Sequence, residues 1–258
     1  MNIKEQIEQL IVQIKQQPTN YDLRVALIQY YCIDGQWDKA QKTVDQYLKL
    51  SNKKEQVKFL LQFNIIAEIE RLNTLKGILE LKFFPDSEIK IGELNKKIFK
   101  SVIQDTNQIA VKEQFLNSFE YYTESFNISL NNGHSFSGIW IDSDVRFSFI
   151  LEIFVQEQYY WLAISEIASI KFKANQYLTD ILWRRAEIIL KDGRHIACFI
   201  PARYPFFESD NISDKLKYCK ETQWLDYGEL SVAQGQKTWT NGTVDVGILD
   251  IFSFENKS

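Results

Sequence analysis

The sequence predicts an α+β fold, in which a helical N-terminal region packs against a C-terminal module of mixed, mostly β structure. Two patterns carry this prediction: apolar residues repeat at helical spacing over about the first 125 positions, and short alternating runs joined by tight turns follow them. A chain of 258 residues that is 45% hydrophobic and 25% charged has enough apolar material for a sizeable core. We therefore expect a helical part at residues 1–125 and an α+β, mostly β part at residues 126–258, packed on each other.

The first helix is expected in the stretch NIKEQIEQLIVQIKQQP, where apolar residues recur on one face and Pro18 ends the run. The stretch from Tyr21 to Leu50 then has the spacing of one tetratricopeptide helical hairpin, which the following 34 residues do not repeat. Gly35 permits the turn between the two helices, and the small Ala40 lets them approach closely. The hairpin positions are Tyr31, Gly35, Trp37, Ala40, Val44 and Tyr47.

Three further helices are expected in the N-terminal part, around Glu55–Leu81, Ile91–Gln104 and Ile109–Thr123, with the segment Phe83–Glu88 as a break between them. The pattern changes at NISLNNGHSFSG, which is rich in Asn, Ser and Gly and is expected to be a loop.

Tight turns mark the C-terminal part. Asp192-Gly193 and Asn241-Gly242 each stand between alternating or β-branched runs, which is the composition of a β-hairpin. The chain before them is expected to contain a helix from Val145 to Phe154 and strands at Tyr159–Ala163 and Ile167–Phe172.

The composition argues against several classes of protein. A net charge of −4 disfavours a nucleic-acid partner, because phosphate binding requires a basic surface. The opening MNIKEQIEQL lacks the apolar core of a signal peptide, and no segment approaches the ~18 apolar residues of a membrane span. We therefore expect a cytoplasmic protein without membrane insertion. Cys32, Cys198 and Cys219 have no zinc-site spacing and are expected to be reduced, buried thiols.

Residues with catalytic chemistry are few. His134 and His195 are the only histidines, and each stands beside a turn or loop, where a solvated side chain is expected. The sequence has none of the motifs of nucleophile elbows, phosphate-binding loops, zinc proteases or dinucleotide sites. The prediction is a protein that is not an enzyme and has no cofactor or metal.

One acidic group leaves two interpretations open. Asp142 and Asp144 lie two residues apart, with Arg146 and Glu152 after them. Paired carboxylates can bind a divalent cation, and the alternative function is therefore a small-ligand or metal-dependent activity centred on Asp142, Asp144 and Arg146. The same pair suits the start of a helix, where aspartate caps free N–H groups and pairs with arginine. We favour the capping and ion-pair interpretation.

The motif IPARYP fixes its backbone twice, because Pro201 and Pro205 stand on either side of Arg203 and Tyr204. We expect Arg203 to form a bidentate ion pair with one of three carboxylates, so that the corner mainly stabilises the fold. These carboxylates are Asp142, Asp144 and Glu152.

Aromatic residues supply the candidate anchors for a partner. The run Tyr159-Tyr160-Trp161 is interpreted as a strand that buries alternate rings, with a ligand-stacking group as the alternative. Arginine and large aromatic residues are common anchors at interfaces. A groove near the junction of the two halves is therefore expected, lined by some of Tyr160, Trp161, Arg203, Tyr204 and Trp224.

A series of landmarks resembles the ImpE/TagJ family of type VI secretion accessory proteins. In order, they are W-I-D-x-D-x-R at 140–146, Glu152, Tyr-Tyr-Trp at 159–161, Leu-Trp at 182–183, I-P-x-R-Y-P at 200–205, T-x-W at 222–224 and G-Q-Lys at 235–237. The stretch LRVALIQYYCIDGQWDKA, which contains Trp37, is similar to the N-terminal signature of that family, so the likeness covers nearly the whole chain. The chain departs from the family at Lys237, where arginine is usual, and at Phe147-Ser148-Phe149, where Gly-Pro is usual.

The resemblance implies a non-enzymatic cytoplasmic adaptor. Members bind the N-terminal helix of the small contractile-sheath subunit, of the TssB/VipA type, and are linked to the unfoldase ClpV that recycles contracted sheaths. A tetratricopeptide-like hairpin suits recognition of such a helix in a groove.

Overall fold

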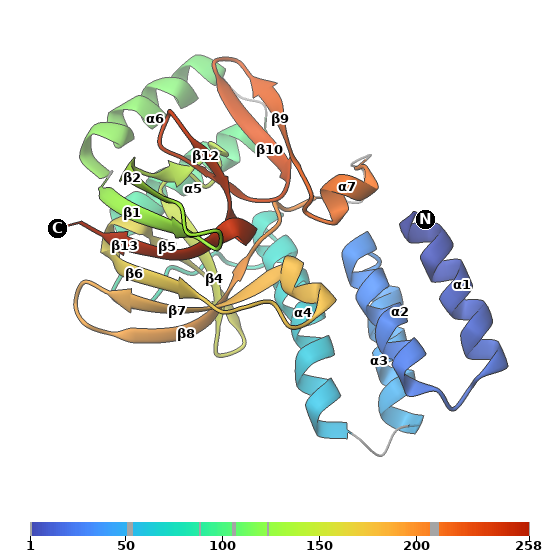
Figure 1. Ribbon diagram of the computed structural model, residues 1–258. Coiled ribbons are helices and arrows are strands. Elements are labelled where there is room, and N and C mark those ends of the chain that lie inside the picture. The colour runs from blue at the N-terminus through green and yellow to red at the C-terminus, as the bar shows by residue number, and fades with distance from the viewer. Residues whose placement is uncertain are drawn as a thin grey trace.

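The computed structural model describes residues 2–50, 54–87, 89–104, 107–122, 124–206 and 212–257, and of residues 54–61, 89 and 120–122 only the backbone. Helices make up the N-terminal part and antiparallel strands follow, which confirms the predicted α+β fold (Figure 1). The helices are α1 (Ile3–Gln16), α2 (Tyr21–Asp34), α3 (Trp37–Leu50), α4 (Lys54–Leu75), α5 (Ile89–Ile103), α6 (Gln108–Tyr122) and the short α7 (Asp214–Lys217).

The predicted hairpin is formed by α2 and α3. Gly35 ends α2 with a left-handed φ of +78°, and the next N–H, of Gln36, donates to the Tyr31 carbonyl at 2.9 Å. Ala40 is completely buried, which allows the helices to pack closely. The first helix also follows its pattern, since it starts from a capping box at Asn2 and ends before Pro18.

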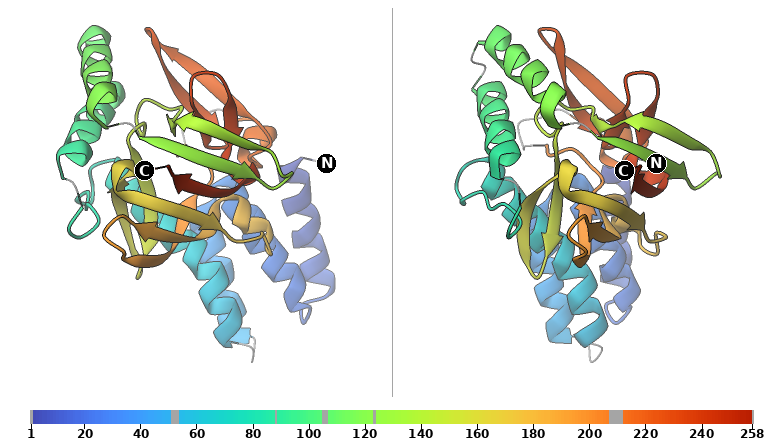
Figure 2. Two further views of the ribbon diagram at one scale, coloured as in Figure 1. Left: turned by 60° about the vertical axis from the view of Figure 1, so that its left-hand side comes forward. Right: turned by 90° about the vertical axis from the view of Figure 1, so that its left-hand side faces the viewer.

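Eight strands form an antiparallel sheet in the order β2-β1-β13-β6-β7-β8-β4-β5. Two smaller sheets, β10-β9 and β12-β11-β3, accompany it. Helices α4 and α5 contact β5 at one edge, and Figure 2 shows the pair α5 and α6 on the side of the molecule away from α1. The strands are β1 (Ser125–Leu130), β2 (Ser135–Ile139), β3 (Ile141–Asp142), β4 (Ile150–Val155), β5 (Gln158–Ala163), β6 (Ile167–Phe172), β7 (Trp183–Leu190), β8 (His195–Pro201), β9 (Thr222–Tyr227), β10 (Leu230–Gly235), β11 (Thr238–Thr240), β12 (Asp245–Gly247) and β13 (Ile251–Asn256).

Both predicted turns and both predicted strands are confirmed. Gly193 joins β7 to β8 and Gly242 joins β11 to β12, each with a positive φ, at +88° and +80°. The strands predicted at Tyr159–Ala163 and Ile167–Phe172 correspond to β5 and β6.

Two predictions for the C-terminal part are wrong. The helix expected from Val145 to Phe154 is a turn followed by β4, whose residues Ile150–Phe154 are all buried. Such a run lacks the alternation that separates a strand from a helix. The loop expected at NISLNNGHSFSG is the hairpin β1–β2, in which Phe126 and Ile128 are buried and Asn127 between them is partly exposed.

The two halves share a core. One cluster of buried residues joins Ile28 of α2 and Ile65 of α4 to Phe154 of β4 and Trp183 of β7. A second cluster fills the other side of the sheet, and a third lies between α5, α6 and the β9–β10 hairpin. The division into domains at residues 1–125 and 126–258 stays a prediction.

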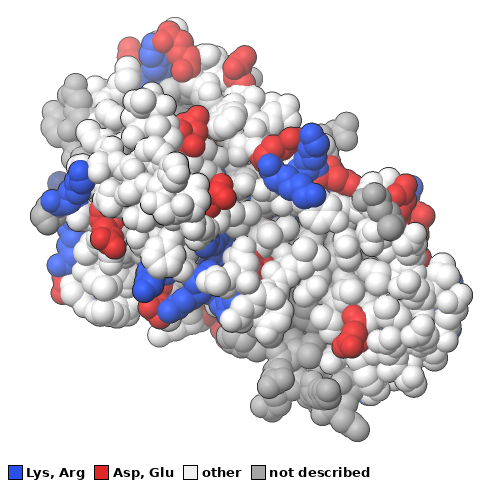
Figure 3. All heavy atoms as spheres, in the orientation of Figure 1, with Lys and Arg blue, Asp and Glu red and all other residues white. Residues whose placement is uncertain are grey.

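The predicted burial of the cysteines and exposure of the histidines are confirmed. All three cysteines are buried free thiols, and both histidines are exposed. None of the described helices is long and apolar enough to span a membrane. Figure 3 shows basic and acidic groups interspersed between broad uncharged areas on one face.

Candidate functional site

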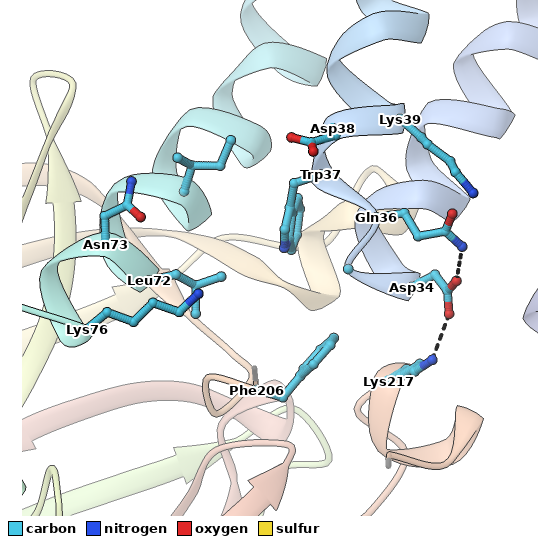
Figure 4. Close-up of a pocket in the computed structure, with 12 residues that line it drawn as sticks. Asp34, Gln36, Trp37, Asp38, Lys39, Leu72, Asn73, Lys76, Phe206 and Lys217 are labelled. Carbon is cyan, nitrogen blue, oxygen red and sulfur yellow. Dashed lines mark hydrogen bonds and ion pairs between the residues drawn. The ribbon is translucent and has the colours of Figure 1, made fainter. Parts of the chain in front are cut away.

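A hollow of about 490 Å³ lies where the helical half meets the C-terminal half. We call it the junction pocket. It is bounded by the α2–α3 turn, by the C-terminal half of α4, and by Phe206 and α7 (Figure 4). Its lining residues are Asp34, Gly35, Gln36, Trp37, Asp38, Lys39, Ile69, Leu72, Asn73, Lys76, Phe206 and Lys217.

The apolar side chains of the junction pocket come from three separate elements. Trp37, the first residue of α3, and Phe206 project into the hollow from opposite sides, and Leu72 of α4 stands beside them (Figure 4). Ile69 of α4 remains 37% exposed. The space is large enough for one or two large side chains of a partner. Aromatic side chains of this kind commonly form the pockets into which such anchors insert.

Gly35 allows Phe206 to reach this position. A Cβ atom on Gly35 would lie 2.8 Å from two carbons of the Phe206 ring, and its φ of +78° is one that side chains disfavour. The glycine of the helical hairpin therefore serves the turn and the pocket wall together.

The rim of the junction pocket is charged. Lys217 of α7 donates to the Asp34 carboxylate at the end of α2, at 2.7 Å, and the amide of Gln36 donates to the same carboxylate (Figure 4). Asp38, Lys39 and Lys76 complete the rim. The Lys217–Asp34 pair ties α7 to the helical hairpin, because both side chains are largely buried.

Arg203 holds the pocket together from behind. Its guanidinium donates to the backbone carbonyls of Ile33, at 2.8 Å, and Lys217, at 3.0 Å, and lies 4.4 Å from the centre of the Phe206 ring. It therefore binds the C-terminal end of α2, whose last carbonyls lack helical partners and attract a cation. The ion pair predicted for Arg203 is wrong. Among the described residues its guanidinium donates to backbone carbonyls, while other cations bind the three carboxylates.

Tyr204 points the opposite way, into a buried polar network. Its hydroxyl donates to Asp142 at 2.6 Å and accepts the N–H of Thr238 at 3.2 Å. Lys237 donates to the other oxygen of Asp142 at 2.5 Å and also lies 3.2 Å from Glu152. The network thus joins the IPARYP corner to β3, β4 and the segment before β11.

Arg71 of α4 connects this network to the helical half. It forms the bidentate pair with Glu152, at 2.7 and 2.8 Å, and contacts Glu68 at 3.3 Å. Tyr159 donates to Glu152 at 2.6 Å. The three charged side chains are at least 94% buried, so the pairing with hydrogen bonds around it is needed to compensate for desolvation.

The pKa values of two network carboxyls shift in opposite directions. Burial by itself would raise the pKa of Glu152, but the charges of Arg71 and Lys237 outweigh burial and lower that pKa to about 2. Burial raises the pKa of Asp142, and Lys237 offsets the rise only in part. Glu152 is therefore held as the anion that neutralises the buried cations.

Asp144 and Arg146 form a second buried ion pair, with atoms 2.6–3.1 Å apart. Asp142 and Asp144 do accept backbone N–H groups, from Asp144 and Arg146 at 3.0 and 2.8 Å, but these groups belong to a turn and not to the predicted helix start. All four carboxylate oxygens of the two aspartates accept internal hydrogen bonds, and no metal-binding group of three side chains occurs in the described part of the chain.

The residues predicted to line the groove do not share one exposed surface. Trp161, Arg203 and Tyr204 are at most 3% exposed, and they support the site from inside. Tyr160 is half-buried against Phe84. Trp224 is 43% exposed on the β9–β10 hairpin. Their role in partner binding stays a prediction.

The sequence analysis did not identify two important residues: Phe206, which lines the junction pocket, and Arg71, which connects α4 to the buried network. Phe206 follows Pro205 directly, so the same rigid corner that indicated Arg203 could have indicated it. Arg71 carries no local signal, since its partner Glu152 lies 81 positions away in the sequence.

Comparisons with known proteins give three results. Residues 133–255 match the family model described as ImpE protein. The chain is 24% identical over 249 residues to the Pseudomonas aeruginosa protein described as type VI secretion system accessory component TagJ, covering 96% of this chain and 85% of TagJ. The crystal structure of protein VPA1032 from Vibrio parahaemolyticus superposes with a TM-score of 0.77 at 23% identity, covering 99% of this chain and 94% of the other. The last result establishes the fold.

Proposed function

This chain belongs to the ImpE/TagJ family, and from that premise we propose that it is an accessory component of a type VI secretion system that acts by binding proteins and not by catalysis. The likeness to TagJ along almost the whole chain carries the proposal. A cytoplasmic location is part of it.

The partner we propose is the N-terminal helix of the small sheath subunit, of the TssB/VipA type, with a link to the unfoldase ClpV. The family resemblance found in the sequence suggests this partner. The place we propose for the helix is the junction pocket, because it combines large apolar side chains with a charged rim, as do sites that hold an amphipathic helix.

The apolar surface continues from the junction pocket along α4. Ile66 and Ile69, three positions apart, are 47% and 37% exposed and lie on one face of the helix. A partner helix that places one side chain between Trp37 and Phe206 would cover this face as well. An interface of this kind buries roughly 1,200 Å² in total, at the low end for specific complexes.

The test is a fluorescence-anisotropy titration with a labelled peptide that carries the N-terminal helix of the small sheath subunit from the same organism. We expect saturable binding that a helix-breaking proline in the peptide abolishes. Ile69→Asp should weaken the binding at least tenfold, because it places a charge in the apolar wall. Ile109→Asp on α6, where the side chain is 71% exposed, is the matched control and should bind as the unchanged chain does.

Two results would contradict parts of the proposal. Absence of binding up to the solubility limit of the peptide would reject the sheath helix as partner. Full binding by Ile69→Asp would keep the partner and reject the junction pocket as its site.

A further inference from the structure

A second hollow, of about 400 Å³, lies between the end of α4, the loop that follows it and the C-terminal half of α5. We call it the α4–α5 pocket. Lys76 lines both this pocket and the junction pocket, so the two hollows open on either side of the end of α4.

The floor of the α4–α5 pocket is apolar and rigid. It is formed by Phe99 of α5 and Trp161 of β5, which are 6% and 1% exposed and whose rings meet edge-on at 6.0 Å. The indole N–H of Trp161 donates to the Tyr159 hydroxyl at 2.7 Å, which fixes the ring. A floor that is already ordered loses little entropy when a ligand side chain packs on it.

The mouth of the α4–α5 pocket carries two large aliphatic side chains that are still in contact with water. Leu79 and Ile103 are 44% and 50% exposed. Leu79 is brought there by Gly77, whose φ of +76° ends α4 and lets the Ile78 N–H close the turn on the Asn73 carbonyl at 2.8 Å. Exposed apolar residues gathered around a recess are a feature of ligand-binding grooves.

The rim has an excess of positive charge. Lys76, Lys96 and Lys100 line the pocket together with a single acidic residue, Glu80. Lys96 also pairs with Glu93 at 3.1 Å, but α5 as a whole has four lysines and one glutamate. This basic segment stands out in a chain whose net charge is −4, and it favours a partner of opposite charge.

From this geometry we propose that the α4–α5 pocket is a docking site for an acidic amphipathic segment of a partner protein. The segment inserts one large apolar side chain between Leu79 and Ile103, onto Phe99, and places carboxylates against the lysines of the rim. The proposal does not depend on the sheath subunit as partner. A protein segment fits better than a flat membrane surface, which does not reach the recessed floor. It also fits better than a nucleic acid, whose phosphates gain nothing from the aliphatic side chains at the mouth.

The experiment uses the full chain and two fluorescein-labelled amphipathic peptides. Both have the same leucine and phenylalanine face, and one carries glutamate while the other carries lysine on the polar face. Anisotropy is measured at about 0.15 M salt, where unspecific long-range attraction is screened. We expect the glutamate peptide to bind at least tenfold more tightly than the lysine peptide.

Variants then locate the binding. Lys100→Glu should weaken binding of the glutamate peptide about three- to tenfold, and Leu79→Asp should weaken it about tenfold. The control is Lys90→Glu, which makes the same change of charge on an exposed lysine at the opposite end of α5, about 15 Å away. This control should bind normally, and circular dichroism should confirm that all three variants are folded.

Several outcomes would overturn the proposal. These are equal binding of the two peptides, no binding of the glutamate peptide, or a Lys90→Glu effect as large as that of Lys100→Glu. Binding to anionic lipid vesicles without peptide binding, lost in Lys100→Glu, would assign the site to a membrane surface instead. If Ile69→Asp loses binding of the sheath peptide but binds the glutamate peptide normally, the two sites are separate, and the α4–α5 pocket does not depend on the junction pocket.

Discussion

Replacing Glu152 with glutamine tests whether the buried ion network holds the two halves together. The carboxylate of Glu152 accepts two hydrogen bonds from Arg71 of α4 and lies 3.2 Å from Lys237, with no exposed surface on its side chain. Glutamine keeps the volume but removes the negative charge. Arg71 and Lys237 then remain buried with too few anions around them.

The magnitude follows from the pKa. Folding lowers the pKa of Glu152 from 4.5 to about 2, and at about 1.4 kcal/mol per pKa unit this corresponds to about 3 kcal/mol of stability. Removal of one partner from a buried pair usually costs about 3–5 kcal/mol, which agrees. Since the folded pKa lies below the unfolded one, the contribution is complete above about pH 5 and decreases as the pH falls toward 2. At pH 3 about 2 kcal/mol of it should be lost.

The assay is urea unfolding followed by tryptophan fluorescence at pH 7, 5 and 3, on the unchanged chain and on Glu152→Gln. We expect Glu152→Gln to unfold at a lower urea concentration than the unchanged chain, with an unchanged slope. The difference in stability between the two chains should be smaller at pH 3 than at pH 7. Glu187→Gln is the control, since Glu187 forms an exposed pair with Lys173 and its loss should leave the midpoint unchanged. A difference below about 1 kcal/mol at pH 7, or one of equal size at pH 3 and pH 7, would refute the reasoning.

Three further changes have outcomes fixed by the structure. Gly35→Ala should lower the stability by about 1–2 kcal/mol and weaken peptide binding at the junction pocket. Gly77 has a similar φ, but no neighbouring side chain lies within 4 Å of the new Cβ, so Gly77→Ala should cost only the backbone strain. Thermal unfolding of the two variants makes the comparison. Arg203→Lys should lower the melting temperature although it keeps the charge, because one ammonium cannot reproduce the guanidinium's contacts with two carbonyls and the Phe206 ring; an unchanged melting temperature would contradict this role. Burial raises the pKa of each cysteine thiol to about 12, so a thiol-reactive dye at pH 8 should label none of them until the chain is unfolded; rapid labelling of the native chain would show that the thiols are accessible.

Local chemistry could be predicted from the sequence. The turns at Gly35, Gly193 and Gly242 require particular backbone angles, and each was found from the residues around it. The tetratricopeptide-like hairpin was found for the same reason, because its spacing lies within one short stretch.

Features that depend on distant contacts could not be predicted. Strand β4 is buried on both sides, and its apolar run is equally compatible with a helix until its neighbours are known. The corner at Arg203 was recognised, but the carbonyls that it binds belong to Ile33 and Lys217, which no sequence rule connects to it. The predicted anchors Trp161 and Tyr204 are buried beneath the exposed walls of the candidate sites, since aromatic residues serve cores as readily as interfaces.

The place of β13 between β1 and β6 in the large sheet constrains how the chain is made. Its neighbours β1 and β6 precede it by many residues, and Phe126 of β1 pairs with Asn256, about 130 positions later. At roughly 5–20 residues per second, β1 leaves the ribosome on the order of ten seconds before its partner. Without β13, the strand order leaves only two separate groups that can pair, β2–β1 and β6–β7–β8–β4–β5, each with an open edge where β13 inserts. The nascent chain is therefore most exposed to misassociation until β13 is made, because its sheet still lacks the strand that joins the two groups.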